Sequence, residues 1–186
     1  MQKSEKGRSK ISGFGTLKIM VAASFLAALS IVLGKYLAFN IGTLFRLSFE
    51  NLPIILAATS FGPFVGVAVG VVADLVGCLM VGYDINPIVT VGAGAIGLIA
   101  GLLYRLPPLR NFPSLGRLGI TVASAHLVGS VIIKSIGLAA YYTYPLPILM
   151  LWRALNYLAV GVAEAAVLYL LYRSKAVTRQ IEALKK

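Results

Sequence analysis

The sequence predicts an all-α integral membrane protein, a bundle of six transmembrane helices with both termini in the cytoplasm. The first observation is composition: 59% of the 186 residues are hydrophobic and only 12% are charged, with a mean hydropathy of +0.88. A soluble domain carries about twice that share of charged residues. The second observation is that apolar runs of about 20 residues, the length needed to cross the hydrocarbon, fill most of the chain. The expected spans are residues 17–39, 44–60, 63–82, 87–105, 117–141 and 147–173.

The ends of these spans follow from turn residues and prolines. The first span is longer than the apolar core of a secretory signal and further spans follow it, so we interpret it as a helix of the mature protein. Phe61-Gly62-Pro63 forms a tight turn between spans two and three, and Leu106-Pro107-Pro108 ends span four. Pro53 inside span two implies a kink, a shortened helix or a late helix start. The chain thus divides into a basic arm (1–16), a membrane domain (17–173) and a basic tail (174–186).

The basic residues fix the expected orientation. Of the 17 Lys and Arg residues, those in the N-terminal arm, around the connection after span four and in the tail all fall on one side of the predicted bundle. Such a bias marks the cytoplasmic side. The net charge of +11 therefore indicates anionic lipid and a cytoplasmic partner as neighbours, and it needs no nucleic acid.

The other charged residues of the membrane domain predict a pocket near its outer surface. A charge at the bilayer centre costs about 2.5–3.5 kcal/mol on insertion scales, so such residues normally face a protein interior or a water-filled cavity. Arg153, Asn156 and the following Tyr157 share one face of span six, and Arg46 with Glu50 could neutralise one another. The outer basic residues are Lys35, Arg46, Lys134 and Arg153, and the outer acids are Glu50, Asp74 and Asp84.

Aromatic residues gather at the same level, where they form either an interfacial belt or part of the pocket. With the charges and amides, they suit a planar, anionic organic solute. For Asp74, a structural pair with Lys or Arg is the alternative to a binding role. The aromatic residues are Tyr83, Tyr141, Tyr142, Tyr144 and Trp152.

His126 and Glu164 break this pattern because both fall in the cytoplasmic half. If spans five and six are antiparallel neighbours that turn near residue 144, His126 faces Glu164. A buried structural pair is our preferred interpretation, since a buried charge needs a partner. A proton relay is the alternative.

Catalytic, nucleotide-binding and metal-binding motifs are absent from the sequence. The single Cys78 excludes an intramolecular disulfide, and the glycines of residues 91–101 are typical of close helix packing. We therefore expect no enzyme activity, cofactor or metal. On span one, Ala23 and Ala27, with Ser24 and Ala28 beside them, form strips of small residues that suit contact with another helix, either inside the bundle or on a partner protein.

Three segments carry a resemblance to a known family. They are LFRLSFENLPIILAATSFGPFVG (44–66), VADLVGCLMVGYDINPIVTVGAGAIG (72–97) and HLVGSVIIKSIGL (126–138). Together with the basic N-terminus and six spans, they resemble the folate branch of the substrate-binding S components of energy-coupling factor (ECF) vitamin transporters. The resemblance implies a bacterial cell-membrane protein that captures a vitamin outside and docks onto a transmembrane coupling subunit with two ATPases.

The resemblance also implies site residues. The family's alanine motif falls on Ala23 and Ala27, which become the expected docking face. Folate-branch members often carry Phe-Pro-Gly-Phe-Thr entering helix four; here Pro87 and Thr90 fit, but the aromatics are replaced, which leaves the vitamin open. For a folate-like ligand, the expected contacts are Asp74 or Asn86 to the ring edge, Tyr83, Tyr141 or Trp152 to the ring faces, and Arg46, Lys134 or Arg153 to the carboxylates, with Asn156 beside them.

Other functions stay open at this stage. One is an S component for a different vitamin or metabolite, and another is a self-sufficient secondary transporter or channel, although no convincing inverted repeat supports that class. A lipid-handling membrane enzyme is disfavoured by the missing catalytic motifs.

Overall fold

The computed structural model describes residues 17–41, 45–112, 114–142 and 144–185. Within these residues, five helical segments are long and apolar enough to cross a membrane, and Asn51–Phe61 is a shorter apolar helix. The helical membrane class predicted from composition is confirmed. The long segments are Leu17–Tyr36, Pro63–Val81, Pro87–Arg105, Ser114–Tyr142 and Leu146–Arg173.

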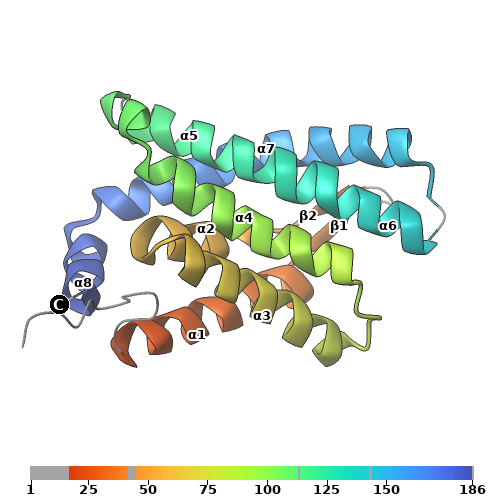
Figure 1. Cartoon of the computed structure of the whole chain (residues 1–186), viewed down its shortest axis with the longest axis horizontal. Helices are drawn as coiled ribbons and strands as arrows, with labels where there is room; N and C mark the ends of the chain where they lie inside the picture. Colours follow the sequence, from red (N-terminus) through yellow and green to blue (C-terminus); the bar gives the residue numbers. More distant parts are fainter. Residues whose placement is uncertain (1–16, 42–44, 113, 143, 186) are drawn as a thin grey trace, which may run out of the picture.

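The elements run in a simple order along the chain (Figure 1). Two of the long segments contain π-helical stretches, which insert an extra residue per turn and often mark functional sites. The elements are α1 (Leu17–Ile31) with η1 (Val32–Tyr36), β1 (Phe39–Ile41), β2 (Phe45–Leu47), α2 (Asn51–Phe61), α3 (Pro63–Val81), α4 (Pro87–Arg105), η2 (Pro107–Asn111), α5 (Ser114–Ala125), η3 (His126–Ile133), α6 (Lys134–Tyr142), α7 (Leu146–Arg173) and α8 (Lys175–Lys185).

Two expectations are corrected between α1 and α2. The predicted second span, 44–60, is not a helix over its whole length, because α2 begins only at Asn51. Pro53 explains the late start, since proline fits the first turn of a helix but clashes further inside it. The strands β1 and β2 pair antiparallel ahead of α2, with Asn40 opposite Arg46, so the chain is not purely α-helical.

Helix α4 lies in the middle of the bundle, between α3 and the continuous segment of α5, η3 and α6 (Figure 1). Glycines allow this close packing. A Cβ atom added at Gly97 of α4 would lie 2.2 Å from the carbonyl carbon of Gly66 on α3, and one added at Gly70 would lie 2.4 Å from the carbonyl oxygen of Ala93. Real Cβ contacts are longer than this, so the backbones of α3 and α4 meet directly.

The turn between α3 and α4 is built by local signals. Gly82 adopts the left-handed conformation (φ 70°) that ends α3, which glycine takes at no steric cost. Asn86 then caps α4, because its Oδ1 accepts hydrogen bonds from the backbone N–H groups of Ile88 and Val89. Pro87 follows in the first turn, where a missing N–H costs nothing.

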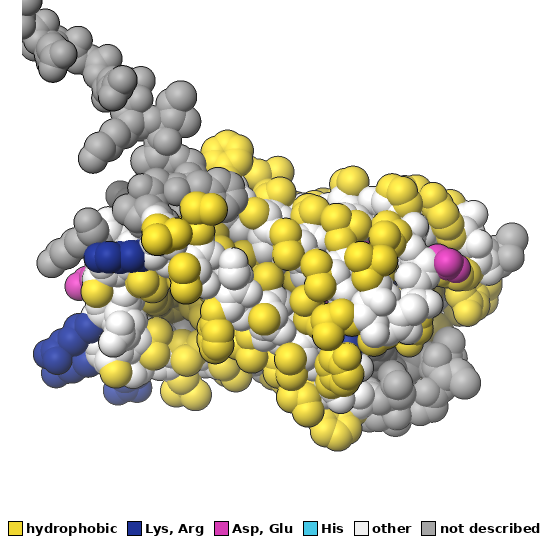
Figure 2. Space-filling view, turned by 90° about the horizontal axis from the view of Figure 1, so that it is seen from below, with side chains coloured by type: hydrophobic (Ala, Val, Ile, Leu, Met, Phe, Trp, Pro, Cys, Tyr) yellow, Lys and Arg dark blue, Asp and Glu magenta, His cyan; other side chains and the backbone are white. Residues whose placement is uncertain are grey.

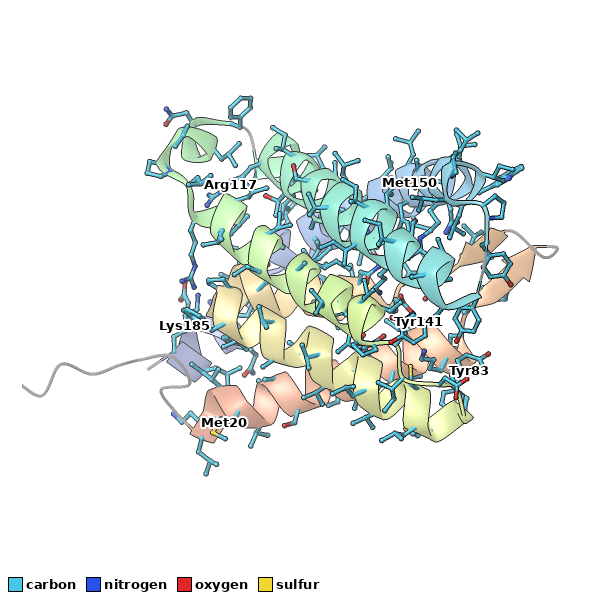
Figure 3. The ribbon with its side chains drawn as sticks, turned by 45° about the vertical axis from the view of Figure 1, so that its right-hand side comes forward. Met20, Tyr83, Arg117, Tyr141, Met150 and Lys185 are labelled. Atoms are coloured by element: carbon cyan, nitrogen blue, oxygen red, sulfur yellow. The ribbon has the colours of Figure 1, made fainter. Side chains whose placement is uncertain are left out.

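The bundle has two unlike ends. Tyr83 and Tyr141 lie at one end, and Met20, Arg117 and Lys185 lie at the other (Figure 3). The second end also carries α8, which lies across the bundle at a steep angle to the long helices (Figure 1). We call this second end the basic end, after the Lys and Arg side chains gathered there. We call the end with Tyr83 and Tyr141 the cavity end.

Candidate functional site

A cavity of about 490 Å³ opens at the cavity end of the bundle. Its wall comes from the end of η1, the segment before α2, helices α3 and α4, and the facing parts of α6 and α7. It combines aromatic rings with charged groups of both signs. The charged lining residues are Lys35, Glu50, Asp74, Asp84, Lys134 and Arg153.

The structure brings most of the predicted site residues together in this wall. The predicted residues that line the cavity are Asp74, Tyr83, Asn86, Lys134, Trp152, Arg153 and Asn156. Tyr141 does not line it: its side chain is 55% exposed, and the neighbouring Tyr142 and Tyr144 take the place expected for it. The reason is helical geometry, since one residue along α6 turns a side chain by about 100°. Arg46 lies in β2, and its side chain is outside the described part of the structure.

Lys134 and Glu50 form a salt bridge in the cavity wall. The Lys134 Nζ lies 3.2 Å from the Glu50 Oε1, and the lysine side chain is buried. The pair joins the start of α6 to the residue that precedes α2. The structure places Lys134 on Glu50, while the suggested pair of Arg46 with Glu50 lies outside the described side chains. The contact fixes the hairpin side of the cavity against α6.

Asp74 and Asn86 are held by hydrogen bonds at the wall between α3 and α4. The Thr90 hydroxyl donates to the Asp74 Oδ2 at 2.7 Å. The Asn86 Nδ2 donates to the backbone carbonyl of Gly137 at 2.9 Å, while its oxygen caps α4. The Asn86 amide therefore locks α4 to α6. Asp74 is the more available acceptor of the two, because one carboxylate offers about four lone-pair sites.

Arg153 lines the cavity from α7, and contacts with Ser130 and Tyr157 hold its side chain in place. Its Nε donates to the backbone carbonyl of Ser130 at 2.8 Å, and its guanidinium lies 5.4 Å from the ring centroid of Tyr157. Ser130 lies in the π-helical stretch η3, where the regular helical hydrogen bonds are shifted. Arg153 lines the cavity and is held through its Nε, and a guanidinium has further N–H donors that suit a carboxylate.

Lys35 is a cavity residue that the sequence analysis placed at the right depth but did not assign to the site. Its stem packs against Gly77, where an added Cβ would lie 2.9 Å from the Lys35 Cε. Its Nζ lies 5.5 Å from the Tyr83 ring centroid and 4.0 Å from the Cys78 Sγ. The sequence signal that could have assigned it to the site was its charge, because Lys35 lies near the end of the first apolar span. Cys78 also lines the cavity, and nothing in its sequence context indicates this.

The predicted pair of His126 and Glu164 is confirmed. The His126 Nε2 lies 2.6 Å from the Glu164 Oε2, and both side chains are buried. The other ring nitrogen lies 3.2 Å from the Ser130 hydroxyl, and the ring stacks on Tyr157 at 4.7 Å between centroids. Because Tyr157 and Ser130 also contact Arg153, this pair supports the cavity wall from behind.

Ala23 and Ala27, the expected docking pair, are packed inside the bundle with 7% and 4% of their surface exposed. They are not a free docking face in this structure, which corrects that assignment. The neighbouring small pair, Ser24 and Ala28, lies on the exposed side of α1. The two pairs are offset by one residue along α1. Because both pairs consist of small residues four apart, sequence spacing cannot tell which pair faces outward.

The cavity shows binding geometry and not catalytic geometry. Among the described residues, no group of His, Cys, Asp and Glu is arranged to hold a metal ion. Four charged residues of the wall are held in place: Lys134 and Glu50 pair with one another, Asp74 accepts from a hydroxyl and Arg153 donates to a backbone carbonyl. Such a wall offers fixed hydrogen-bonding positions around a ligand with planar and charged parts.

Comparisons with known proteins agree with the fold. The sequence pattern of the family described as "ECF transporter, substrate-specific component" matches residues 18–173. The crystal structure of FolT bound with folic acid is similar over 84% of this chain and 93% of that chain, with a TM-score of 0.68 and 23% identity. The S component of a bacterial ECF transporter is similar over 91% and 98%, with a TM-score of 0.63 and 27% identity. No curated protein sequence matches the chain.

Proposed function

Since this chain belongs to the family of substrate-specific components of ECF transporters, we propose that its cavity captures folate or a related pterin-containing vitamin. The chain is a substrate-binding membrane subunit and not an enzyme. Its partners are those of the family, a transmembrane coupling subunit and two ATPases, which supply the energy for uptake.

The observation that carries the ligand proposal is the chemistry of the cavity wall. Folate has a planar pterin ring with a hydrogen-bonding edge at one end and carboxylates at the other. The cavity places the Asp74 carboxylate on α3, aromatic rings such as Trp152 on α7, and the Arg153 guanidinium in one wall. The similar fold of FolT, which is described as bound with folic acid, supports the same ligand class.

We assign the contacts by charge and shape. Asp74 accepts hydrogen bonds from the donor edge of the pterin ring, as a carboxylate does from paired N–H groups. Tyr83 and Trp152 stack on the rings, which is favourable by about 0.5–1.5 kcal/mol beyond the area buried. Arg153 binds the carboxylates, together with Lys35 or Lys134. Asn86 positions the wall through its bonds to α4 and α6.

The single tryptophan makes a direct test of this assignment. Trp152 lines the cavity, and the chain contains no other tryptophan. Folate that enters the cavity is expected to quench the Trp152 fluorescence of the purified protein, with saturation at micromolar concentration or below. Folinate should compete, and thiamine or riboflavin should not. Absence of folate and folinate binding, with tight binding of another vitamin, would remove the ligand proposal and leave the family intact.

We further propose that six segments cross the membrane with both termini in the cytoplasm. Helix α2 has 11 residues and is about 16 Å long at 1.5 Å per residue. It crosses together with the β1–β2 hairpin, which completes the span at the cavity end. The cavity then opens outward, and the basic end meets the inner leaflet, in keeping with the positive-inside rule.

Cysteine labelling tests this orientation. In a Cys78→Ala background, Asp84→Cys at the cavity end and Lys185→Cys at the basic end each provide one exposed thiol. A membrane-impermeant maleimide added to intact cells should label the first variant only. Labelling of Lys185→Cys without cell lysis would contradict the proposed orientation.

We also propose that the exposed small-residue strip of α1, Ser24 with Ala28, faces the coupling subunit. The Ser24 hydroxyl bonds back to the carbonyl of Met20 at 3.0 Å, so it leaves a flat surface. Small residues four apart let a partner helix approach closely.

A further inference from the structure

Helix α8 is fixed across the basic end of the bundle by hydrogen bonds. The Thr178 hydroxyl donates to the carbonyl of Tyr172 at 3.1 Å, which ties the first turn of α8 to the end of α7. The Tyr172 hydroxyl is in turn bonded to Thr59 at 2.7 Å and Ser60 at 2.9 Å on α2. The chain therefore positions α8 over α1 and α2.

An apolar groove of about 390 Å³ lies between α8 and these two helices. Its walls are Phe25 and Leu26 on α1, Leu56 on α2, and Val177, Ile181 and Leu184 on α8. The α8 residues repeat at helical spacing, so they form the apolar face of an amphipathic helix. Phe25 remains 69% exposed, which shows that the groove is open along the side of the bundle.

Helix α8 carries basic side chains outside the residues that line this groove. Arg173, Lys175, Arg179 and Lys185 lie on or directly before α8 and are all exposed, against the single acid Glu182 of that helix. Figure 2 shows Lys and Arg side chains gathered at one end of the molecule, with hydrophobic side chains covering much of the surface beyond them. A cluster of Lys and Arg directly after a membrane span and on an amphipathic helix is typical of binding to anionic lipid.

We propose that this groove, which we call the α8 groove, binds one anionic phospholipid. An acyl chain lies between Phe25, Leu56 and Ile181, and the phosphate headgroup contacts the basic residues of α8. A lipid is favoured over a protein helix because α8 directly follows a membrane-spanning helix. The segment from Arg173 to Lys185 also carries four exposed Lys and Arg residues against one acid. The site is at the opposite end from the cavity and does not depend on which vitamin the cavity takes.

The test uses the full chain in detergent, titrated with phosphatidylglycerol or phosphatidylcholine of equal chain length and analysed by native mass spectrometry. We expect the unmodified protein to retain phosphatidylglycerol with roughly tenfold or greater preference, given the favourable effect of each nearby basic residue. The charge variant Lys175→Gln/Arg179→Gln/Lys185→Gln should lose that preference. Ala22→Phe, which fills the groove from α1, should reduce retention of both lipids.

The matched control is Ala123→Phe, which fills a different apolar groove between α5 and α7. It should leave the preference for phosphatidylglycerol unchanged. Thermal unfolding in detergent reports whether each variant is folded, and the charge variant, which alters only exposed side chains, tests the site even where Ala22→Phe unfolds the chain. Equal retention of both lipids by the unmodified protein, or an unchanged preference in the charge variant, would overturn the proposal. So would a result in which both variants keep the lipid but lose the coupling subunit, since the groove would then bind protein.

Discussion

Lys134 and Arg153 both line the cavity, but their surroundings predict different consequences when they are replaced. Lys134 is buried and paired with Glu50, so its charge is already balanced within the protein. Arg153 is held through its Nε by a backbone carbonyl and through its ring contact with Tyr157, neither of which neutralises it. Arg153 is therefore the stronger candidate for binding a ligand carboxylate.

Replacing Arg153 with Ala is expected to raise the Kd for folate by roughly 10- to 100-fold. The loss corresponds to about 1.5–3 kcal/mol, the contribution of a hydrogen bond to a charged group. Trp152 fluorescence measures it, and Arg173→Ala, an exposed arginine at the basic end, is the matched control and should bind as the unmodified protein does. Unchanged affinity in both Arg153→Ala and Lys134→Ala would remove the carboxylate assignment.

The pair of His126 and Glu164 is expected to act in stability. Replacing His126 with Ala leaves the Glu164 carboxylate buried without its partner at 2.6 Å, and breaking a buried pair costs about 3–5 kcal/mol. The double variant His126→Phe/Glu164→Leu removes both polar groups and keeps a ring against Tyr157, so it should recover most of that loss. Thermal unfolding in detergent measures both. Normal folding and folate affinity combined with lost uptake in His126→Ala would instead favour a proton relay.

At the scale of elements, the sequence was sufficient for the long helices and for their ends at glycine and proline. Gly82 and Asn86 bound the turn between α3 and α4 through local chemistry that residue type specifies. The β1–β2 hairpin was missed because each strand has three residues, too few to show a period against the apolar background. The amphipathic α8 was taken for a basic tail because its charge was more conspicuous than its apolar face.

The depth of the site along the bundle was predictable from the sequence, but which side chains point into the cavity was less so. Charged residues in apolar spans marked one depth of the bundle, and most of them do line the cavity. The π-helical stretches η1 and η3 change the rotation of the residues that follow, and single-residue rotation also separates Tyr141 from the wall and Ala23 from the exposed face. Rotation depends on packing between helices, which one sequence does not display.

The contact between α3 and α4 predicts that replacing Gly97 with alanine lowers stability much more than replacing Gly116 does. Gly97→Ala would place a methyl group 2.2 Å from the Gly66 backbone, so α3 and α4 must separate. Overpacking typically costs about 1–3 kcal/mol, and backbone contact puts this variant at the upper end or beyond. Gly116→Ala in α5 meets nothing within 4 Å, and the higher helix propensity of alanine should leave stability unchanged or slightly raised. Equal unfolding temperatures for both variants would contradict the packing described for α4.

At the scale of the whole molecule, the two ends of the bundle carry different chemical groups. The cavity end carries hydrogen-bonding and aromatic groups, and the basic end carries cations and an amphipathic helix. Helix α1 runs between them, with Ala23 and Ala27 toward the core and Ser24 and Ala28 outward. A partner that binds the exposed strip can therefore move the bundle without entering the cavity.

Bulky residues on the exposed strip are expected to block assembly without affecting capture of the substrate. Ala28→Trp should prevent co-purification of the coupling subunit and both ATPases, because a large ring keeps the partner helix from close approach. Val162→Trp is the control, since Val162 is 68% exposed on α7 and lies away from α1. Both variants should still bind folate, because neither residue lines the cavity. Isothermal titration calorimetry measures this binding, since each variant adds a second tryptophan. Retained co-purification in Ala28→Trp, or equal loss in Val162→Trp, would contradict this docking face, and uptake into liposomes without ATPases would contradict the need for docking at all.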